Sequence, residues 1–367
     1  MACGITSDIC FIFTGADRQR RSLKGSILKK SLMLALSLGL AANAAHAEKR
    51  ELVISAYPIA QPLFMKYVYE PFKAKCGCDI KVETGNNADR IAKLVVHRNN
   101  PVIDLVLLSD SGMLEAAQKG VIQKMDYAKL SNYGQLYDAA KNPIGGNFAV
   151  GYTLYSVGLV YRTDKVAPLT SWKDLWRPEL KGRVALPDVS TTQGPLMLRM
   201  ADAAWGGKTD DYATGFAKIV GLKGNVVTFS KNSAQLAALF AQDEIWAAPV
   251  ARFTWSQMLK TGLPLKWSIP AEGQAAGMNV MGIVAGSKNA DLAYQLMDFW
   301  LSKEVQTQLA TNLVDSPVNK DVRLSVAAAQ FNTYGQDQIN SLKFVKPETI
   351  LKQRSGWMEQ WNKAMSK

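Results

Sequence analysis

The side chains with the greatest intrinsic reactivity are few in this 367-residue sequence. Cys76 and Cys78 form a Cys-Gly-Cys sequence, and the nearest histidine is His97. This spacing admits a disulfide only in a tight loop, and a structural metal site needs more ligands than these three residues supply. We expect two ordinary cysteines, free or oxidised, at a turn between a helix and a strand. A nucleophilic Cys76 or Cys78 is the alternative from the enzyme class, but His97 is a poor activating partner.

Sequence signatures of catalysis are otherwise missing. The sequence contains no Walker-type phosphate loop, no G-x-S-x-G and no H-E-x-x-H. His97 is the only histidine after residue 47, which removes most Ser-His and Cys-His mechanisms. We therefore predict a protein that is not an enzyme and that uses neither a cofactor nor a bound metal.

The N-terminal segment has the pattern of a secretory signal. Lys29 and Lys30 precede an apolar run over 32–40, and the small residues that follow end in Ala45-His46-Ala47. A positive region, a short apolar stretch and an A-x-A site are typical of a cleaved signal peptide. The run is shorter than the ~20 residues of a membrane-spanning helix. We predict a signal peptide over 1–47 and a mature chain, 48–367, in the periplasm.

The charge of the mature chain does not indicate a polyanionic partner. The whole sequence has 43 Lys and Arg against 31 Asp and Glu. Residues 1–47 hold six of the basic and two of the acidic residues, which leaves 37 and 29 and a net charge of +8. No block of five or six like charges occurs, so a solvated surface is expected, without nucleic acid. The length of 48–367 suffices for two lobes with separate cores.

Strand and helix patterns alternate along the chain, which is typical of an α/β protein. Expected strands cover 51–56, 79–83, 103–108, 153–162, 184–186, 226–229, 245–250 and 278–285. Expected helices cover 61–75, a segment opening at 87, 170–176, 233–240, 253–259, 290–301 and 304–313. Strand 103–108 is apolar throughout, which suggests a parallel strand covered on both faces. The Ser109-Asp110-Ser111 sequence after it resembles a helix N-cap, and Thr191 or Thr192 is expected to cap another helix.

Several sequence strings, in the same order along the chain, resemble the bacterial spermidine/putrescine-binding family. They are DLVLLS (104–109), GVIQKMD (120–126), TSWKDLWRPELKG (170–182), IWAAP (245–249), PAEG (270–273), SKN (287–289) and SPVN (316–319). Each string alone is a weak signal. Together they are similar to the wider family of type II periplasmic binding proteins.

This resemblance implies a two-lobed α/β fold, in which each lobe is a mixed sheet flanked by helices. Lobe 1 would comprise 48–152 and 279–330, lobe 2 would comprise 153–278, and 331–367 would form a C-terminal helical segment. A small solute would bind in the cleft at the carboxyl ends of strands, and the lobes would close on it by a hinge motion. The implied function is the monomeric substrate-binding component of an ABC importer, which delivers the solute to transmembrane permease subunits.

The resemblance also places the ligand contacts on this sequence. It implies an aromatic contact at Tyr57 and a further contact at Ser111, beside Ser109 and Asp110. Several family positions carry a different residue type here. The family's acidic pair falls at Val189 and Thr192, its tryptophans fall near Ala251 and Gly277, its other carboxylate falls at Asn279, and a last pocket position falls at Asp315.

These replacements bear on the ligand. Polyamines are cations held by carboxylates and aromatic faces. The expected lining has hydroxyls, an amide and one guanidinium instead: Ser109, Ser111, Ser190, Thr191, Thr192, Asn279 and Arg252. Such groups favour anions, so we predict an anionic or zwitterionic solute such as a phosphonate, an amino acid or an organic acid. A polyamine is the alternative, and an iron(III) receptor of the same fold is another, although the sequence has no adjacent tyrosine pair and Tyr57 and Tyr334 do not decide it.

Each predicted contact also has a purely structural explanation. Ser111 and Thr192 could serve only as helix caps, and Tyr57 could pack instead of stacking on a ligand. Arg252 could extend into solvent. Asp110 could simply complement a helix dipole.

Overall fold

Ten strands form one continuous mixed sheet in the part of the chain that the structure describes. The structure is a computed structural model and describes residues 49–208 and 210–366. The strand order is β2-β1-β3-β9-β4-β7-β5-β6, with β10 beside β9 and β8 beside β4. The strands are β1 (Glu51–Ala56), β2 (Asp79–Thr84), β3 (Leu105–Ser109), β4 (Val150–Arg162), β5 (Val184–Pro187), β6 (Val226–Ser230), β7 (Ala247–Ala251), β8 (Leu265–Ser268), β9 (Ala275–Ile283) and β10 (Lys343–Phe344). The predicted signal peptide lies outside the described residues.

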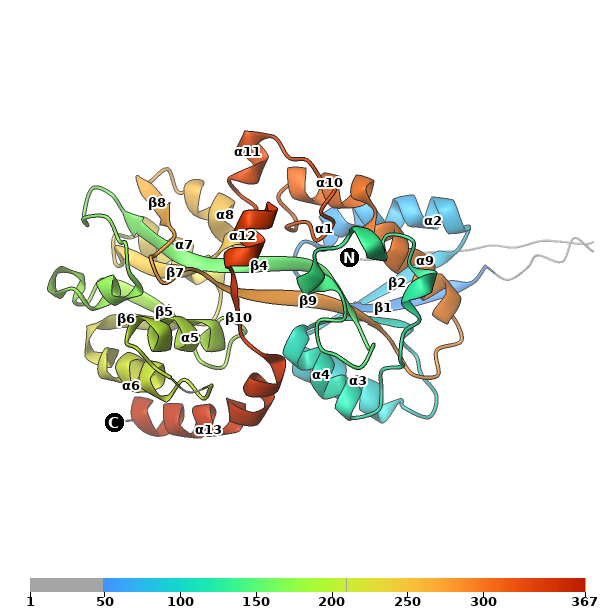
Figure 1. The fold of residues 1–367 in the computed structure, drawn as a ribbon, viewed down its shortest axis with the longest axis horizontal. Coiled ribbons are helices and arrows are strands. Elements are labelled where there is room, and N and C mark those ends of the chain that lie inside the picture. Colours follow the sequence, from blue (N-terminus) through green and yellow to red (C-terminus); the bar gives the residue numbers. More distant parts are fainter. Residues whose placement is uncertain (1–48, 209, 367) are drawn as a thin grey trace, which may run out of the picture. The chain divides into compact units, whose positions relative to one another are not determined.

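The two long strands β4 and β9 lie side by side in the middle of the sheet and connect its two sides (Figure 1). All thirteen residues of β4 are buried, because its side chains are apolar on both faces and both faces are covered. On one side of this pair, β1, β2 and β3 run parallel to one another. On the other side β5, β6 and β7 do the same. The predicted α/β fold is confirmed, and the antiparallel β4–β9 pair joins the two groups of strands into one sheet.

Helices surround the sheet and alternate with its strands along the chain. They are α1 (Gln61–Phe64), α2 (Glu70–Cys76), α3 (Asn87–Val96), α4 (Asp110–Gln118), α5 (Gly194–Ala204), α6 (Ala213–Gly221), α7 (Ser233–Ala241), α8 (Trp255–Leu259), α9 (Ala290–Leu301), α10 (Lys303–Thr311), α11 (Val326–Ala329), α12 (Gln336–Ser341) and α13 (Pro347–Met365). None of the helices within 49–208 and 210–366 is long and apolar enough to cross a bilayer.

Two predicted helix boundaries differ from the structure. The expected helix 61–75 contains a π-helical turn, Met65–Tyr69, between α1 and α2. Pro71, which has no amide hydrogen to donate, lies two residues beyond the end of this turn. The helix expected to start at Thr191 or Thr192 begins at Gly194 instead. The N-cap position is Gln193, which makes no side-chain cap hydrogen bond. The Thr191 hydroxyl donates to the Asp188 carbonyl (2.7 Å) and accepts from Gly194 N (3.2 Å) at the start of the helix.

The hydrophobic side chains gather in two large clusters, which we call the first core and the second core. The first core draws on the chain up to Leu154 and again from Ala276 to Leu342. The second core begins at Tyr155 and includes Ala275. The chain therefore passes between cores within β4 and again at the start of β9. The lobe boundaries given by the resemblance stay a prediction.

The C-terminal helix α13 belongs to the second core but also touches the other side of the molecule. Trp357 and Trp361 are 5% and 4% exposed and lie in the second core. The ring centroids of Trp361 and Phe229 are 4.6 Å apart. The helix packs against α4, which starts at the end of β3 (Figure 1). Helix α13, within the predicted C-terminal segment, thus contacts both sides of the molecule.

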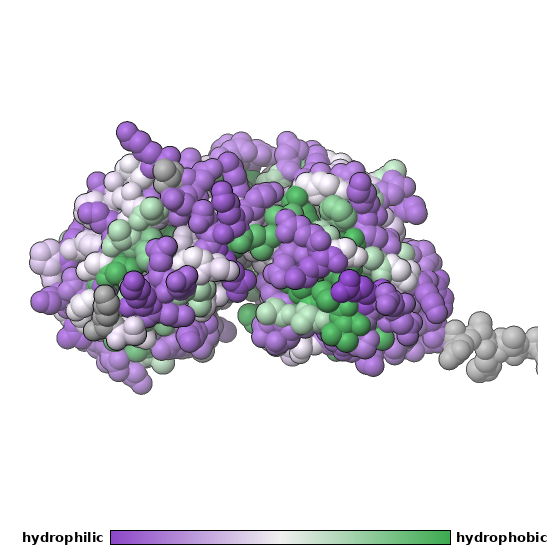
Figure 2. Space-filling view, turned by 90° about the horizontal axis from the view of Figure 1, so that it is seen from below, coloured by the Kyte–Doolittle hydropathy of each residue, from purple (hydrophilic) through white to green (hydrophobic). Residues whose placement is uncertain are grey.

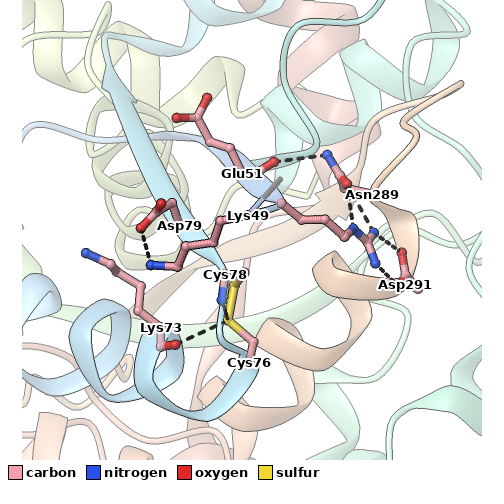
Figure 3. The surroundings of a disulfide bond; sticks show 9 residues. Lys49, Glu51, Lys73, Cys76, Cys78, Asp79, Asn289 and Asp291 are labelled. Carbon is pink, nitrogen blue, oxygen red and sulfur yellow. Dashed lines mark hydrogen bonds and ion pairs between the residues drawn. A yellow bond between two sulfur atoms is a disulfide. The ribbon is translucent and has the colours of Figure 1, made fainter. Parts of the chain in front are cut away.

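Cys76 and Cys78 are joined by a disulfide at the turn between α2 and β2 (Figure 3). Gly77, with φ 63°, is in the left-handed region, which glycine enters without a steric penalty. Beside it, the Lys49 ammonium lies 2.8 Å from an Asp79 carboxylate oxygen. The expected helix-to-strand turn is present and its cysteines are oxidised. Neither carries a free thiol, so the cysteine-nucleophile alternative loses its support.

Removing this disulfide should have only a small effect on stability. Because the loop it closes is three residues long, the chain-entropy relation gives about 1.6 kcal/mol. We expect the double variant Cys76→Ala/Cys78→Ala to lose no more than ~2 kcal/mol of unfolding free energy in urea titrations. Solute affinity should not change, since neither cysteine borders the cavities described below. A loss above 4 kcal/mol would mean that the turn organises the sheet.

Candidate functional site

The polar ends of several strands converge where β3, β9 and β4 lie side by side. Asn279 on β9 pairs with Ser109 at the end of β3 and with Thr153 on β4. Tyr57 follows β1 directly, and its hydroxyl donates to Asn87 Oδ1 (2.8 Å). The carboxyl ends of parallel strands in open α/β sheets are the usual place for a ligand. Two adjoining cavities occupy this place.

The first cavity, which we call the aromatic chamber, has a volume of about 130 Å³. It is bordered by Tyr57, Ile59, Ala60, Phe64, Tyr152, Tyr155, Thr192, Phe253, Asn279, Val314 and Asp315. Five of these residues are aromatic, and the Tyr155 and Phe253 rings meet edge to face with centroids 5.3 Å apart. Among the described residues that border this chamber, Asp315 is the only one with a carboxyl group.

Asp315 is the most unusual group in the aromatic chamber. Its Oδ2 atom is buried and has no hydrogen-bond partner. Burial raises the pKa of Asp315 to about 8, and the neighbouring Thr153 side chain partly offsets this rise. An ionised carboxylate in such a place requires a cation. Aromatic faces around it would stabilise the same cation through their quadrupoles.

The second cavity, which we call the hydroxyl chamber, has a volume of about 50 Å³. It is bordered by Asn87, Ser109, Asp110, Ser111, Tyr155, Val189, Ser190, Thr191, Thr192, Pro195, Leu196, Ala276, Gly277, Val345, Ile350 and Arg354. Tyr155 and Thr192 border both chambers. Each volume exceeds the ~10–15 Å³ that a single water needs, so both chambers can receive ligand atoms.

The start of α4 supplies one wall of the hydroxyl chamber. Ser109 caps the helix, because its Oγ accepts from Gly112 N (3.1 Å) and also from Asn87 Nδ2 (2.8 Å). Capping therefore belongs to Ser109 and not to Ser111, whose Oγ lies 3.4 Å from Ser109 Oγ. Burial, with a smaller contribution from the nearby Glu348 carboxylate, raises the pKa of Asp110 to about 7. Near neutral pH the Asp110 carboxyl can therefore donate a proton as well as accept one.

The turn before α5 supplies the opposite wall. Ser190 donates from its hydroxyl to Asp188 Oδ1 (2.5 Å), and Thr191 Oγ1 accepts from Gly194 N (3.2 Å). Both hydroxyls are thus used within the turn that leads into the helix. Thr192 borders both chambers. Of the three, Thr192 is the residue placed for ligand contact in both chambers.

Arg252 lies elsewhere than predicted. It borders neither chamber. Its guanidinium donates to the Gln330 carbonyl and lies 4.5 Å from the Trp267 ring centroid. Burial lowers the pKa of Arg252 to about 10. The structure gives Arg252 a packing role, so the predicted anion contact at this residue has no support.

The other nine predicted site residues border one or both chambers. They are Tyr57, Ser109, Asp110, Ser111, Ser190, Thr191, Thr192, Asn279 and Asp315. Tyr334, considered for an iron site, borders a different cavity with Tyr137 and Arg323. No group of three or more His, Cys, Asp or Glu side chains within 49–208 and 210–366 is placed to hold a metal ion.

The comparisons with known proteins identify the family. The family model for bacterial extracellular solute-binding proteins matches residues 68–335. The chain is a bacterial extracellular solute-binding protein. The family implies a small-molecule ligand and a membrane permease as partners.

The solute-binding protein is similar to several characterised relatives. It is 27% identical over 297 residues to the spermidine/putrescine-binding periplasmic protein of Escherichia coli K12, covering 77% of this chain and 82% of that one. It is 26% identical over 344 residues to the thiamine-binding periplasmic protein of the same organism, covering 86% and 97%. The crystal structure of an ABC transporter protein from Clostridium perfringens ATCC 13124 superposes with a TM-score of 0.78 at 34% identity, covering 86% and 99%.

Sequence reasoning missed the aromatic residues of β4 and the contribution of α13. Tyr152 and Tyr155 are buried in an apolar strand, where they have the pattern of core residues. Ile350 and Arg354 lie beyond the last string that resembles the relatives. For Tyr155, one signal was available: it pairs with Gly277, where the resemblance placed a tryptophan. A Cβ atom at Gly277 would lie 2.5 Å from the Tyr155 ring, so the glycine makes room for the tyrosine.

We expect Gly277→Ala to disturb both chambers at once. The added methyl group would push the Tyr155 ring aside, and such overpacking costs about 1–3 kcal/mol. Solute affinity should fall at least about tenfold in calorimetric titrations, since 1.4 kcal/mol is one decade. Gly224→Ala is the matched control, because a Cβ there meets no atom within 4 Å. Equal affinities of the two variants would show that the Tyr155 ring position does not matter.

Proposed function

We propose that this solute-binding protein captures a small organic solute with an ammonium or related cationic group and delivers it to an ABC permease. The observation that carries the proposal is the buried, unpartnered Asp315 Oδ2 in a chamber of aromatic side chains. No Lys or Arg borders the aromatic chamber. A carboxylate enclosed by aromatic faces is complementary to an organic cation.

The hydroxyl-rich sequence favoured an anionic or zwitterionic solute, and the present proposal differs from the anionic part of that prediction. That prediction relied on Arg252, which lies outside both chambers. The characterised relatives support a cation, because polyamines and thiamine, named for two of them, are both positively charged. The cationic alternative is therefore the better explanation of the aromatic chamber.

The proposal also includes the export of the chain and its closure over the solute. The signal peptide over 1–47 would direct the chain to the periplasm and be removed there. The mature chain would act as a monomer. Its two cores would close over the solute by bending at β4 and β9, as hinge-type binding proteins do. Figure 2 shows a mostly hydrophilic face that is hollowed between the two sides of the molecule.

A melting-temperature screen of residues 48–367 tests the ligand class. The compounds are alkylamines, diamines, amino acids, thiamine, dicarboxylates, phosphonates and iron(III) citrate. A ligand at 100 times its dissociation constant adds ~2.7 kcal/mol of stability. We expect shifts only with compounds that carry an amine or another organic cation. A shift with dicarboxylates or phosphonates, and none with any amine, would overturn the proposal.

A further inference from the structure

We propose that the solute is zwitterionic, with its ammonium group at Asp315 and an acidic group in the hydroxyl chamber facing Arg354 of the C-terminal helix. This inference rests on the proposed function, since it assumes the ammonium site in the aromatic chamber. It adds a specificity-determining residue from α13, at the opposite end of the cavity. The two chambers adjoin at Tyr155 and Thr192, so one short solute can reach both.

The groups around the hydroxyl chamber are mainly hydrogen-bond donors. α4 and α5, of nine and eleven residues, both begin at its edge. Their first turns place positive dipole ends near the cavity, while the Ser111, Gly112 and Gly194 amides donate to oxygens of the chain itself. The hydroxyls of Ser111 and Thr192 also border it. This set is complementary to a carboxylate or phosphonate oxygen.

Arg354 supplies the charge that this donor set lacks. It is the only basic residue bordering either chamber, and it comes from α13, which the second core holds in place through Trp357 and Trp361. Arg354 makes no hydrogen bond or ion pair within residues 49–208 and 210–366. A guanidinium binds carboxylate and phosphonate groups through paired hydrogen bonds.

The protonation state of Asp110, the acidic residue of this chamber, determines whether an acidic group or an ammonium group of the solute binds there. Glu348 and Arg354 on α13 and Tyr155 on β4 lie around it. A protonated Asp110 donates to an acidic solute, whereas an ionised Asp110 would bind a second ammonium group. The donor groups outnumber this one carboxyl, so a zwitterion fits better than a diamine.

Matched solutes separate the two possibilities. Titration calorimetry at pH 6.5 would compare 4-aminobutanoate, 1,4-diaminobutane and butylamine, and then the corresponding five-carbon compounds. We expect the amino acid to bind at least tenfold tighter than the alkylamine and tighter than the diamine. A diamine that binds tightest would overturn the inference and leave the proposed function intact. If no amine binds, the proposed function itself fails.

Arg354→Gln gives the second readout, the ratio of amino acid to alkylamine affinity. We expect this ratio to fall about tenfold or more, since a charge-assisted paired contact is lost. Arg98→Gln, an exposed arginine beyond both chambers, is the control and should keep the ratio. An unchanged ratio in Arg354→Gln would show that the acidic group of the solute does not bind beside Arg354, and would overturn the inference.

The pH profile gives a third readout. The ratio of amino acid to butylamine affinity should fall as the pH rises from 6 to 8, because Asp110 then loses the proton it donates, whereas ionisation of Asp315 acts on both solutes alike. The ratio of diamine to butylamine affinity should instead rise over this range. Asp110→Asn should remove the fall in the first ratio, and a profile that stays the same in this variant would count against the inference.

Discussion

Asp315→Asn should weaken the binding of an amine solute by about 30-fold to a few thousand-fold. Removing one partner of a desolvated, hydrogen-bonded charge pair costs about 2–5 kcal/mol. The asparagine keeps the shape of the side chain and removes only the charge, while the aromatic walls and the Thr153 contact stay in place. Titration calorimetry of both proteins with the same amine measures the difference directly.

The control for this variant is Asp138→Asn, which removes a carboxylate that is 98% exposed and far from the chambers. Its solute affinity should match that of the unaltered protein. Full affinity in Asp315→Asn would place the ammonium group at Asp110 instead, the other carboxyl of the cavity. The double variant with Asp110→Asn would then show the large loss.

The stability of the solute-free protein should decrease as the pH rises from 5 to 8. The pKa of Asp315 is raised to about 8 and that of Asp110 to about 7, whereas both are near 3.9 in the unfolded chain. The folded protein therefore holds protons that the unfolded chain has released, and its stability falls with pH over this range. Because one pKa unit corresponds to ~1.4 kcal/mol, we expect a loss of at least ~2 kcal/mol in urea titrations.

Asp315→Asn tests the origin of this slope. The variant has no charge to bury at this position, so it should be more stable than the unaltered protein at pH 8 and nearly equal to it at pH 5. The pKa values of Asp79, Asp164 and Asp291 are lowered by basic partners. Their stabilising contribution is complete above about pH 5, so these residues add no pH dependence of stability between pH 5 and 8. Parallel curves for the two proteins would show that Asp315 is ionised when the cavity is empty.

Most elements could be predicted from the sequence, because apolar strands and amphipathic helices alternate clearly. The run Leu105 to Leu108 forms β3, and the following Ser109 caps α4. The junction of the sheets could not be predicted, since the pairing of β4 with β9 joins segments about 120 residues apart along the chain. The disulfide could not be predicted either, because the Cys-Gly-Cys spacing alone does not determine the backbone conformation at Gly77.

The candidate site was predicted best where residues follow strands and worst where distant segments meet. Tyr57 and Ser109 follow or end parallel strands, so their position at the cleft followed from the topology. Arg252 also follows a strand, but its side chain turns to Trp267, a choice set by packing. Arg354 reaches the hydroxyl chamber only because α13 returns across the molecule, which no local pattern encodes.

The unbroken β4–β9 pair has a consequence for how the protein denatures. Each strand contributes side chains to the first core at one end and to the second core at the other. Neither core can melt without breaking the backbone ladder on which the other is built. The mature chain should thus lose its structure in a single calorimetric transition, with equal van't Hoff and calorimetric enthalpies, despite having two separate hydrophobic interiors.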